Sequence, residues 1–163
     1  MKNIAIIPAR GGSKRIPRKN IKPFMGKPII AYSIEAALES GLFDEVMVST
    51  DDEEIAMVAR QYGAKVPFMR SAVTANDYAT MENVIEEVLK CYQEKQIYFD
   101  CFCCILSTAP FLTANTLCRS NKMFLDGSFD SLIPVLAYSY PIQRALRWQD
   151  TGLLMREPEH IHT

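Results

Sequence analysis

Short apolar runs alternate with segments of helical periodicity along most of the chain. Continuous apolar runs at residues 4–9 and 46–48, and a run at 99–106 that only Asp100 interrupts, are typical of strands that are buried on both faces of a sheet. Between these runs, apolar residues recur three and four positions apart, as they do in amphipathic helices. Strands that alternate with helices indicate βα units. The pattern therefore predicts an α/β fold with a mostly parallel sheet and helices on both faces.

Turn and capping residues place the expected elements along this pattern. The helix expected from residue 28 has Pro28 in its first turn, ends at Gly41 and carries Ile30 and Ile34, with Ala37 and Leu38, on its apolar face. The run at 99–106 is expected to be the central strand. The other expected features are a helix capped by Thr50 or Asp51 and ended by Gly63, a short strand at 66–69, helices capped by Thr80 and Thr113, a strand at 131–137, and a hairpin around 150–152.

The composition is that of one ordinary globular domain. The chain has 163 residues, of which 48% are hydrophobic and 23% charged. No apolar run approaches the ~18 residues of a membrane span, and the run at 4–9 is shorter than the about 7–15 residues of a signal-peptide core. We therefore expect a cytoplasmic protein that does not bind a membrane. The five cysteines, three of them within 101–104, are expected to be reduced thiols.

Charge is distributed unevenly along the chain. The first 34 residues hold eight basic residues and no acid, whereas the rest of the chain has a formal charge of −9. A cationic segment of this kind attracts anions, among them nucleotides, nucleic acids and acidic lipids.

The long basic loop at 10–27 is the strongest functional signal. Loops between strand and helix usually have about 2–6 residues, and longer ones are often functional. Gly11 and Gly12 would let backbone amides approach a phosphate, Arg10 can grip phosphate oxygens, and Lys14 and Lys19 add point charges. A solvated basic loop is the alternative. Nucleic acid is a weaker hypothesis, because no aromatic residues are interleaved and the rest of the chain is acidic.

Three further segments carry weaker signals. Arg70 opens the loop at 70–79 and can donate to a base carbonyl, and Ser107 and Thr108 at the next strand end can bond a sugar or phosphate. Gln143 and Arg144 suit a carbohydrate or carboxylate ligand. A surface arginine, a helix-entry turn and a rim of the fold are equally consistent with these residues.

Several of these segments resemble the cytidylyltransferases that activate nonulosonic (sialic-type) acids. The resemblance rests on the run IIPARGGSKRIPRKNIKPFMGKPIIAYSIEAA and on VSTDDEEIA, YGAKVPFMR and TAPFLT. The segment SYPIQRALRW favours the branch that acts on pseudaminic acid. The likeness covers essentially the whole chain.

The resemblance implies a fold, a reaction and a set of site residues. The fold is a Rossmann-like sheet of the nucleotide-diphospho-sugar transferase type. The reaction joins an acidic nine-carbon sugar to CTP, forms a CMP-sugar and releases pyrophosphate. Arg10 and Lys19 are implied as catalytic, Arg70 as the reader of cytosine, and Ser107, Thr108, Gln143 and Arg144 as sugar-binding. The full set expected at the nucleotide is Ala9, Arg10, Gly11, Gly12, Ser13, Lys14, Lys19, Asn20, Arg70 and Ala79.

The resemblance also implies Mg²⁺ as cofactor and a homodimer. The family's metal-binding aspartates lie in a D-x-D segment that does not occur in these 163 residues. Asp51 and Asp77 are explained by helix capping and by a turn. We therefore predict no metal ligand here, and expect a nucleotide-binding domain at 1–140 and a hairpin and tail at 141–163 that lead into a missing sugar-binding and dimerisation segment.

Two other functions fit the same residues. One is a non-catalytic nucleotide-binding protein that acts through a partner, and the other is an enzyme like CMP-Kdo synthetase.

Overall fold

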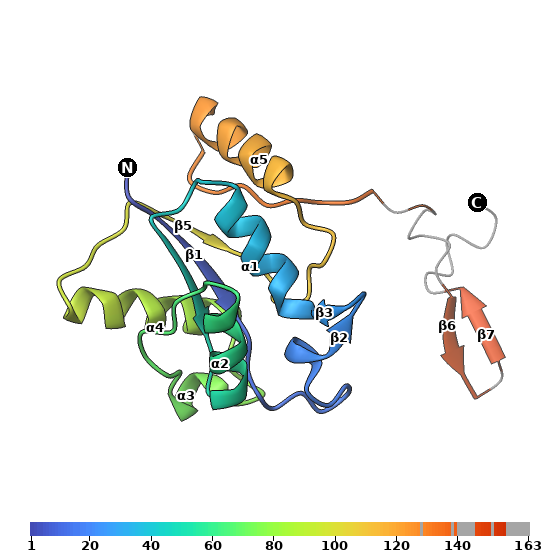
Figure 1. Cartoon of the computed structure of the whole chain (residues 1–163). Coiled ribbons are helices and arrows are strands. Elements are labelled where there is room, and N and C mark those ends of the chain that lie inside the picture. Colours follow the sequence, from blue (N-terminus) through green and yellow to red (C-terminus); the bar gives the residue numbers. More distant parts are fainter. Residues whose placement is uncertain (128, 138, 140–145, 151, 156–163) are drawn as a thin grey trace. The chain divides into compact units, whose positions relative to one another are not determined.

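β1 (Asn3–Pro8) lies at the middle of the sheet. The structure is a computed structural model that describes residues 1–127, 129–137, 139, 146–150 and 152–155. In that part of the chain, β1 pairs in parallel with β4 (Glu45–Ser49) on one side and with β5 (Cys101–Cys104) on the other (Figure 1). The predicted parallel α/β sheet is confirmed. The prediction that 99–106 is its central strand is wrong, because β1 holds that position.

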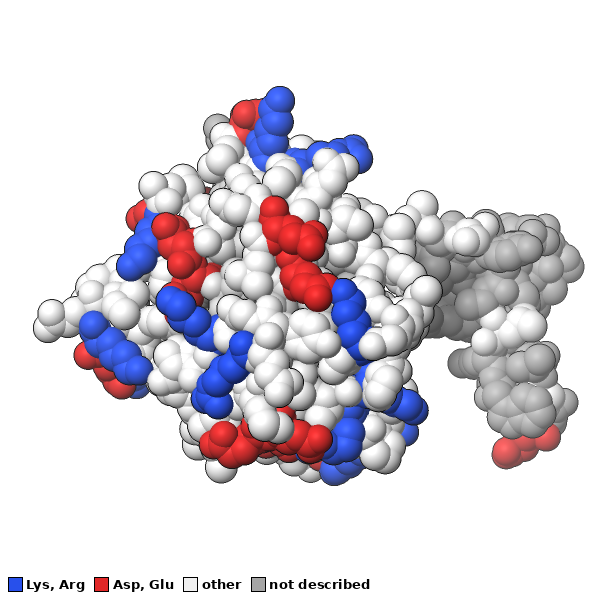
Figure 2. Space-filling model, viewed as in Figure 1, with Lys and Arg blue, Asp and Glu red and all other residues white. Residues whose placement is uncertain are grey.

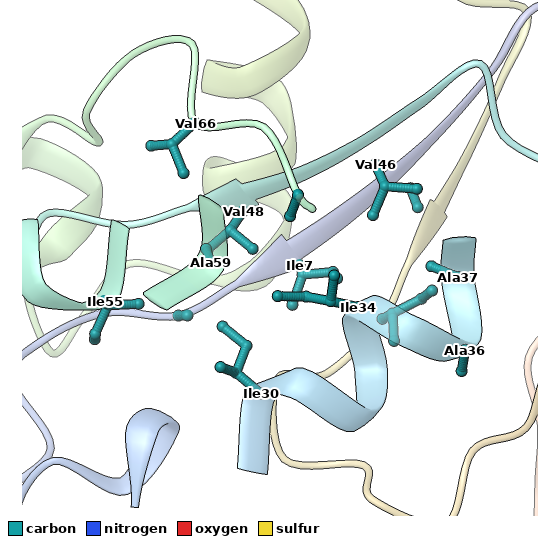
Figure 3. Close-up of a cluster of buried hydrophobic side chains, with 14 of the residues drawn as sticks. Ile7, Ile30, Ile34, Ala36, Ala37, Val46, Val48, Ile55, Ala59 and Val66 are labelled. Carbon is teal, nitrogen blue, oxygen red and sulfur yellow. The ribbon is translucent and has the colours of Figure 1, made fainter. Parts of the chain in front are cut away.

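The two faces of β1 are covered by different helices. Ala5 and Ile7 point into a cluster with α1 (Ile29–Glu39) and α2 (Glu53–Gln61), as Figure 3 shows for Ile7. Ile4 and Ile6 point the other way, into a cluster with α4 (Met81–Glu94). Successive side chains of a strand face opposite sides of the sheet, so an unbroken apolar run fills both layers. The prediction of helices on both faces is confirmed.

The described residues form seven further elements. They are the 3-10 helix η1 (Lys19–Ile21), β2 (Pro23–Phe24), β3 (Lys27–Pro28), α3 (Ala72–Ala75), α5 (Ala114–Asp126), β6 (Leu146–Gln149) and β7 (Gly152–Met155).

Side-chain caps begin three of the helices. Thr80 and Thr113 cap α4 and α5 as predicted, through bonds to the amides of Asn83 and Thr116. The prediction of Thr50 or Asp51 as the cap of α2 is wrong. Asp52 is the cap, and its Oδ1 accepts from two first-turn amides at 3.0 Å. Thr50, Asp51 and Asp52 all have side chains that suit a cap. The direction in which the chain leaves β4 determines that Asp52 reaches the first-turn amides.

Two predicted strands do not form. Just before 66–69, Lys65 forms an isolated bridge with Met47 of β4. Pro67 follows two residues later and has no N–H with which to continue the pairing. Residues 131–137 have no regular structure, and Pro134 interrupts that run in the same way. Ile133, Val135 and Leu136 are exposed there. An apolar run therefore formed a strand only where its amides could pair.

The C-terminal residues form a unit of their own. Contacts divide the chain into Met1–Ser128 and Phe129–Thr163. In the second unit β6 and β7 form the predicted antiparallel hairpin, and Gly152 has φ 119° at its turn. The domain boundary predicted at residue 140 stays a prediction.

Two further features of the described residues concern the cysteines and the length of the helices. All five cysteines are free thiols, and burial raises the pKa of Cys103 to about 11, so that thiol is protonated at neutral pH. No described helix is both long and apolar enough to span a membrane.

The packing of α1 predicts a difference between two of its apolar residues. Ile34 is fully buried in the cluster with β1, whereas Leu38 is 44% exposed. Ile34→Ala should lower the free energy of unfolding by about 2–5 kcal/mol, because it leaves a cavity between helix and sheet. Leu38→Ala, the matched control, should cost about 1 kcal/mol or less. Urea unfolding of both variants measures this, and equal losses would contradict the described core.

Candidate functional site

The basic loop at 10–27, the loop at 70–79 and the turn at 107–108 meet at the carboxyl edge of the sheet and line one cavity of about 830 Å³. Pro8 ends β1, Leu106 follows β5, and Arg70 is bonded to Ser49 at the end of β4. Ligands of open α/β sheets bind at this edge. The predicted site residues that line the cavity are Arg10, Ser13, Lys14, Lys19, Asn20, Arg70, Ala79, Ser107 and Thr108.

Three of the predicted site residues that the structure describes do not line the cavity. Ala9 is buried beneath the loop, where its amide donates to the carbonyl of Ser49 at 2.9 Å. Gly11 and Gly12 lie outside the lining as well. Residues 143 and 144 fall outside the described part of the chain. The ligand-binding roles of all these residues stay predictions.

The Gly11 turn is held by two adjacent aspartates rather than left open. The amide of Gly11, expected to face a phosphate, donates to Asp51 Oδ1 at 2.9 Å. A Cβ on Gly11 would lie 2.7 Å from Asp52 Oδ2 and 2.9 Å from Asp52 Cβ, whereas one on Gly12 would meet nothing within 4 Å. Gly11 is therefore required for close packing on the start of α2, and its amide is engaged within the protein.

Asn20 joins the first loop to the third. Its Nδ2 donates to the carbonyl of Arg10 at 2.8 Å, and its Oδ1 accepts from Ser107 Oγ at 2.9 Å. Asn20 and Ser107 are 4% and 6% exposed, so both polar groups depend on this pairing. The pair fixes where Arg10 leaves β1 relative to the end of β5.

Arg70 is a buried cation at the base of the cavity. Its Nε donates to Ser49 Oγ at 3.0 Å and its Nη2 to Ser49 O at 2.6 Å. Burial lowers the pKa of Arg70, and the carboxylates of Asp51 and Glu87 oppose that change. A buried guanidinium needs such partners. Nη1 has no hydrogen-bond partner among the described residues, so one donor group remains for a ligand.

Arg10 and Lys14 face Asp77 across the cavity. Arg10 Nη1 lies 2.8 Å from Asp77 Oδ1 and donates to Asn76 O at 2.9 Å, and Lys14 pairs with Asp77 Oδ2. Hydrogen bonds from Lys14 and Arg10 lower the pKa of Asp77, which is therefore ionised at neutral pH. The loop at 70–79 thus reaches the cations of the first loop.

Acids from later in the chain compensate much of the basic N-terminal segment. Among the described residues, ion pairs join Arg10 and Lys14 to Asp77, Arg18 to Asp52 and Glu54, and Lys27 to Glu35. Figure 2 shows basic and acidic side chains side by side along the lower edge of the molecule. Lys19 is exposed, lines the cavity and has no ion-pair partner in the described part.

Sequence reasoning missed the contacts of two aspartates. Asp51 was expected to cap a helix and Asp77 to form a turn, but both hold residues of the first loop. The sequence does carry a signal for the contact of Asp77 with the basic loop, because Asp77 is the only acidic residue within 70–79. No local signal separates Asp51 from Asp52.

The described residues do not fit a magnesium site on their own. They contain no group of three His, Cys, Asp or Glu side chains placed to hold a metal ion. Mg²⁺ needs oxygen ligands in octahedral geometry. Asp77 is the carboxylate that lines the cavity, and both of its oxygens are bonded to cations. The chemistry available to the described residues is therefore anion binding by cationic and hydroxyl groups.

Comparison with known proteins identifies the family to which this chain belongs. A family model described as cytidylyltransferase matches residues 4–147. Pseudaminic acid cytidylyltransferase of Campylobacter jejuni subsp. jejuni is 50% identical over 145 residues, which are 89% of this chain and 62% of that protein. CMP-N,N'-diacetyllegionaminic acid synthase of Legionella pneumophila is 43% identical over 117 residues, which are 72% of this chain and 50% of that protein.

Two solved structures share the fold of this chain. CMP:2-keto-3-deoxy-manno-octonic acid synthetase complexed with CTP matches 77% of this chain and 48% of its own, with a TM-score of 0.64 and 27% identity. A cytidylyltransferase from Leptospira borgpetersenii matches 78% of this chain and 50% of its own, with a TM-score of 0.62 and 25% identity. The chain spans 62% of the length of the Campylobacter relative.

The close packing at Gly11 predicts different effects of the same change at adjacent glycines. Gly11→Ala should lower the free energy of unfolding by about 1–3 kcal/mol, because the new methyl group would displace Asp52. Gly12→Ala, the matched control, should change it by about 0.5 kcal/mol or less, since that position is open. Urea unfolding measures both. Equal effects would show that the turn is not packed against α2.

Proposed function

Because the chain belongs to the cytidylyltransferase family, we propose that it transfers CMP from CTP to an acidic nine-carbon sugar of the nonulosonic type. In this reaction the anomeric oxygen of the sugar bonds to the α-phosphorus of CTP, the bond between the α- and β-phosphates breaks, and pyrophosphate leaves. The name of the 50%-identical Campylobacter relative supports pseudaminic acid as the sugar.

The single observation that carries the proposal is the cationic cavity at the carboxyl edge of the sheet. Arg10, Lys14, Lys19 and Arg70 all line it. With Arg15, which also lines it, five cations surround the cavity and suit a ligand with several negative charges. Phosphoryl transfer depends mainly on positioning and charge neutralisation. A volume of about 830 Å³ is in the range of small-molecule sites.

The position of each residue in the cavity suggests which part of the substrates it binds. We assign Arg10, Lys14 and Lys19, on the first loop, to the triphosphate. Arg70 is rigidly held by Ser49 and has Nη1 left to donate to the cytosine carbonyl. Ser107 and Thr108, after β5, are assigned to the sugar side, together with Gln143 and Arg144 from the sequence alone.

The remaining parts of the proposal concern the whole protein. We propose that it works as a cytoplasmic homodimer with Mg²⁺ as cofactor. Free thiols at all five cysteines support a reducing compartment. The dimer and the metal rest on the family resemblance, and the described carboxylates do not by themselves complete the metal site.

A sugar panel tests the substrate. Pseudaminic acid should yield a CMP-sugar in preference to 2-keto-3-deoxy-octonic acid, the sugar type in the name of a structural relative. Faster turnover of the octonic acid would favour the alternative enzyme class.

The proposed nucleotide site predicts the effect of removing single cations. Arg10→Ala and Lys19→Ala should each weaken CTP binding about 10- to 100-fold, as expected when a charged hydrogen bond worth about 1.5–3 kcal/mol is lost. Lys22→Ala is the matched control, because Lys22 is exposed in the same loop and does not line the cavity. Isothermal titration with CTP measures all three. Unchanged affinity in both cavity variants would exclude this site.

A further inference from the structure

Asp77 is the carboxylate that faces the cations of the proposed nucleotide site. One of its oxygens lies 2.8 Å from Arg10 Nη1, the other pairs with Lys14, and all three residues line the cavity. We propose that Asp77 sets the affinity and charge selectivity of the site: it holds Arg10 and Lys14 when no nucleotide is bound and gives them up to the phosphate oxygens of a bound one. This inference rests on the proposed function.

The chemistry of the two kinds of oxygen makes them competitors. Carboxylate and phosphate oxygens accept charge-assisted hydrogen bonds from the same donors. Asp77, Arg10 and Lys14 together carry a net charge of +1, and without the carboxylate charge they would carry +2. A ligand must therefore carry enough charge to displace an internal anion. A triphosphate meets that condition better than a single phosphate does.

The ion pairs are exposed enough to be exchanged. The side chains of Arg10, Asp77 and Lys14 are 35%, 38% and 79% exposed. Solvent-exposed pairs of this kind are weak. The pair between Arg18 and Asp52 differs, because Asp52 also caps α2 and neither residue lines the cavity. Exchange is thus expected at Asp77 and not at Asp52.

Arg10 has a second anchor besides Asp77. Its Nη1 also donates to Asn76 O at 2.9 Å. Asn76 is itself held in a turn, since its Oδ1 accepts from the amides of Tyr78 at 2.7 Å and Ala79 at 2.9 Å. Removing the charge of Asp77 therefore removes the competitor and leaves the arginine anchored. This contact decides the sign of the effect: binding of a polyanion should become tighter.

The test is Asp77→Asn, measured by isothermal titration with CTP and with inorganic tripolyphosphate over a range of salt concentrations. We expect binding of both ligands to tighten about three- to tenfold at low salt and to depend more steeply on salt, because one more positive charge is uncompensated. Asp77→Ser, which also removes the charge, should behave in the same way.

Glu54→Gln is the matched control. It removes one negative charge from an exposed pair with the same loop, but neither Glu54 nor its partner Arg18 lines the cavity. Its affinity for both ligands should stay within about twofold of the original. A similar gain in Glu54→Gln would mean that net charge, rather than exchange at Asp77, is responsible, and would overturn the inference.

The failures of the inference and of the proposed function are distinguishable. If the original chain binds CTP, Arg10→Ala weakens that binding, and both Asp77 variants bind no more tightly than the original, the inference is wrong and the nucleotide site stands. If Arg10→Ala and Lys19→Ala leave the affinity for CTP unchanged, the proposed site itself fails.

Discussion

The parallel pairing of β1 with β4 and β5 is the constraint on which the rest of the structure depends. β1 is buried on both faces, so its position is fixed by α1 and α2 on one side and by α4 on the other. Parallel pairing brings the carboxyl ends of the three strands to one edge. Three loops far apart in the sequence therefore meet there. Without this pairing, the basic loop would have no second and third loop to form a cavity with.

The strand ends do more than bring the loops together, because their polar groups hold the site residues. Ser49, the last residue of β4, accepts two hydrogen bonds from Arg70. Ser107, after β5, donates to Asn20, which in turn holds the carbonyl of Arg10. Buried polar groups must be paired, so these contacts are as much a part of the fold as the apolar core is. They fix the guanidinium of Arg70 and the backbone of Arg10 at the cavity.

The positive charge of the site is partly compensated by a carboxylate. The basic N-terminal segment attracts acids from later in the chain, and one of them, Asp77, lies inside the cavity. Lys19 differs, since it lines the cavity without an ion-pair partner among the described residues. A polyanion entering the cavity would thus meet some cations that are unpaired and others that must exchange partners. Ionic strength is therefore an important variable for this site.

Patterns within single segments determined much of this protein, and contacts between segments decided the rest. The apolar run of β1, the periodicity of α1 and the caps at Thr80 and Thr113 are local, so the sequence alone predicted them. The sequence also singled out Arg10, Lys19 and Arg70, which line one cavity. It did not separate Asp51 from Asp52, and it predicted strands at 66–69 and 131–137 that do not form. Which carboxylate meets which amide or cation, and which apolar run finds a neighbouring strand, depends on distances between segments far apart in the chain. Those distances are fixed only when the sheet and its helices pack.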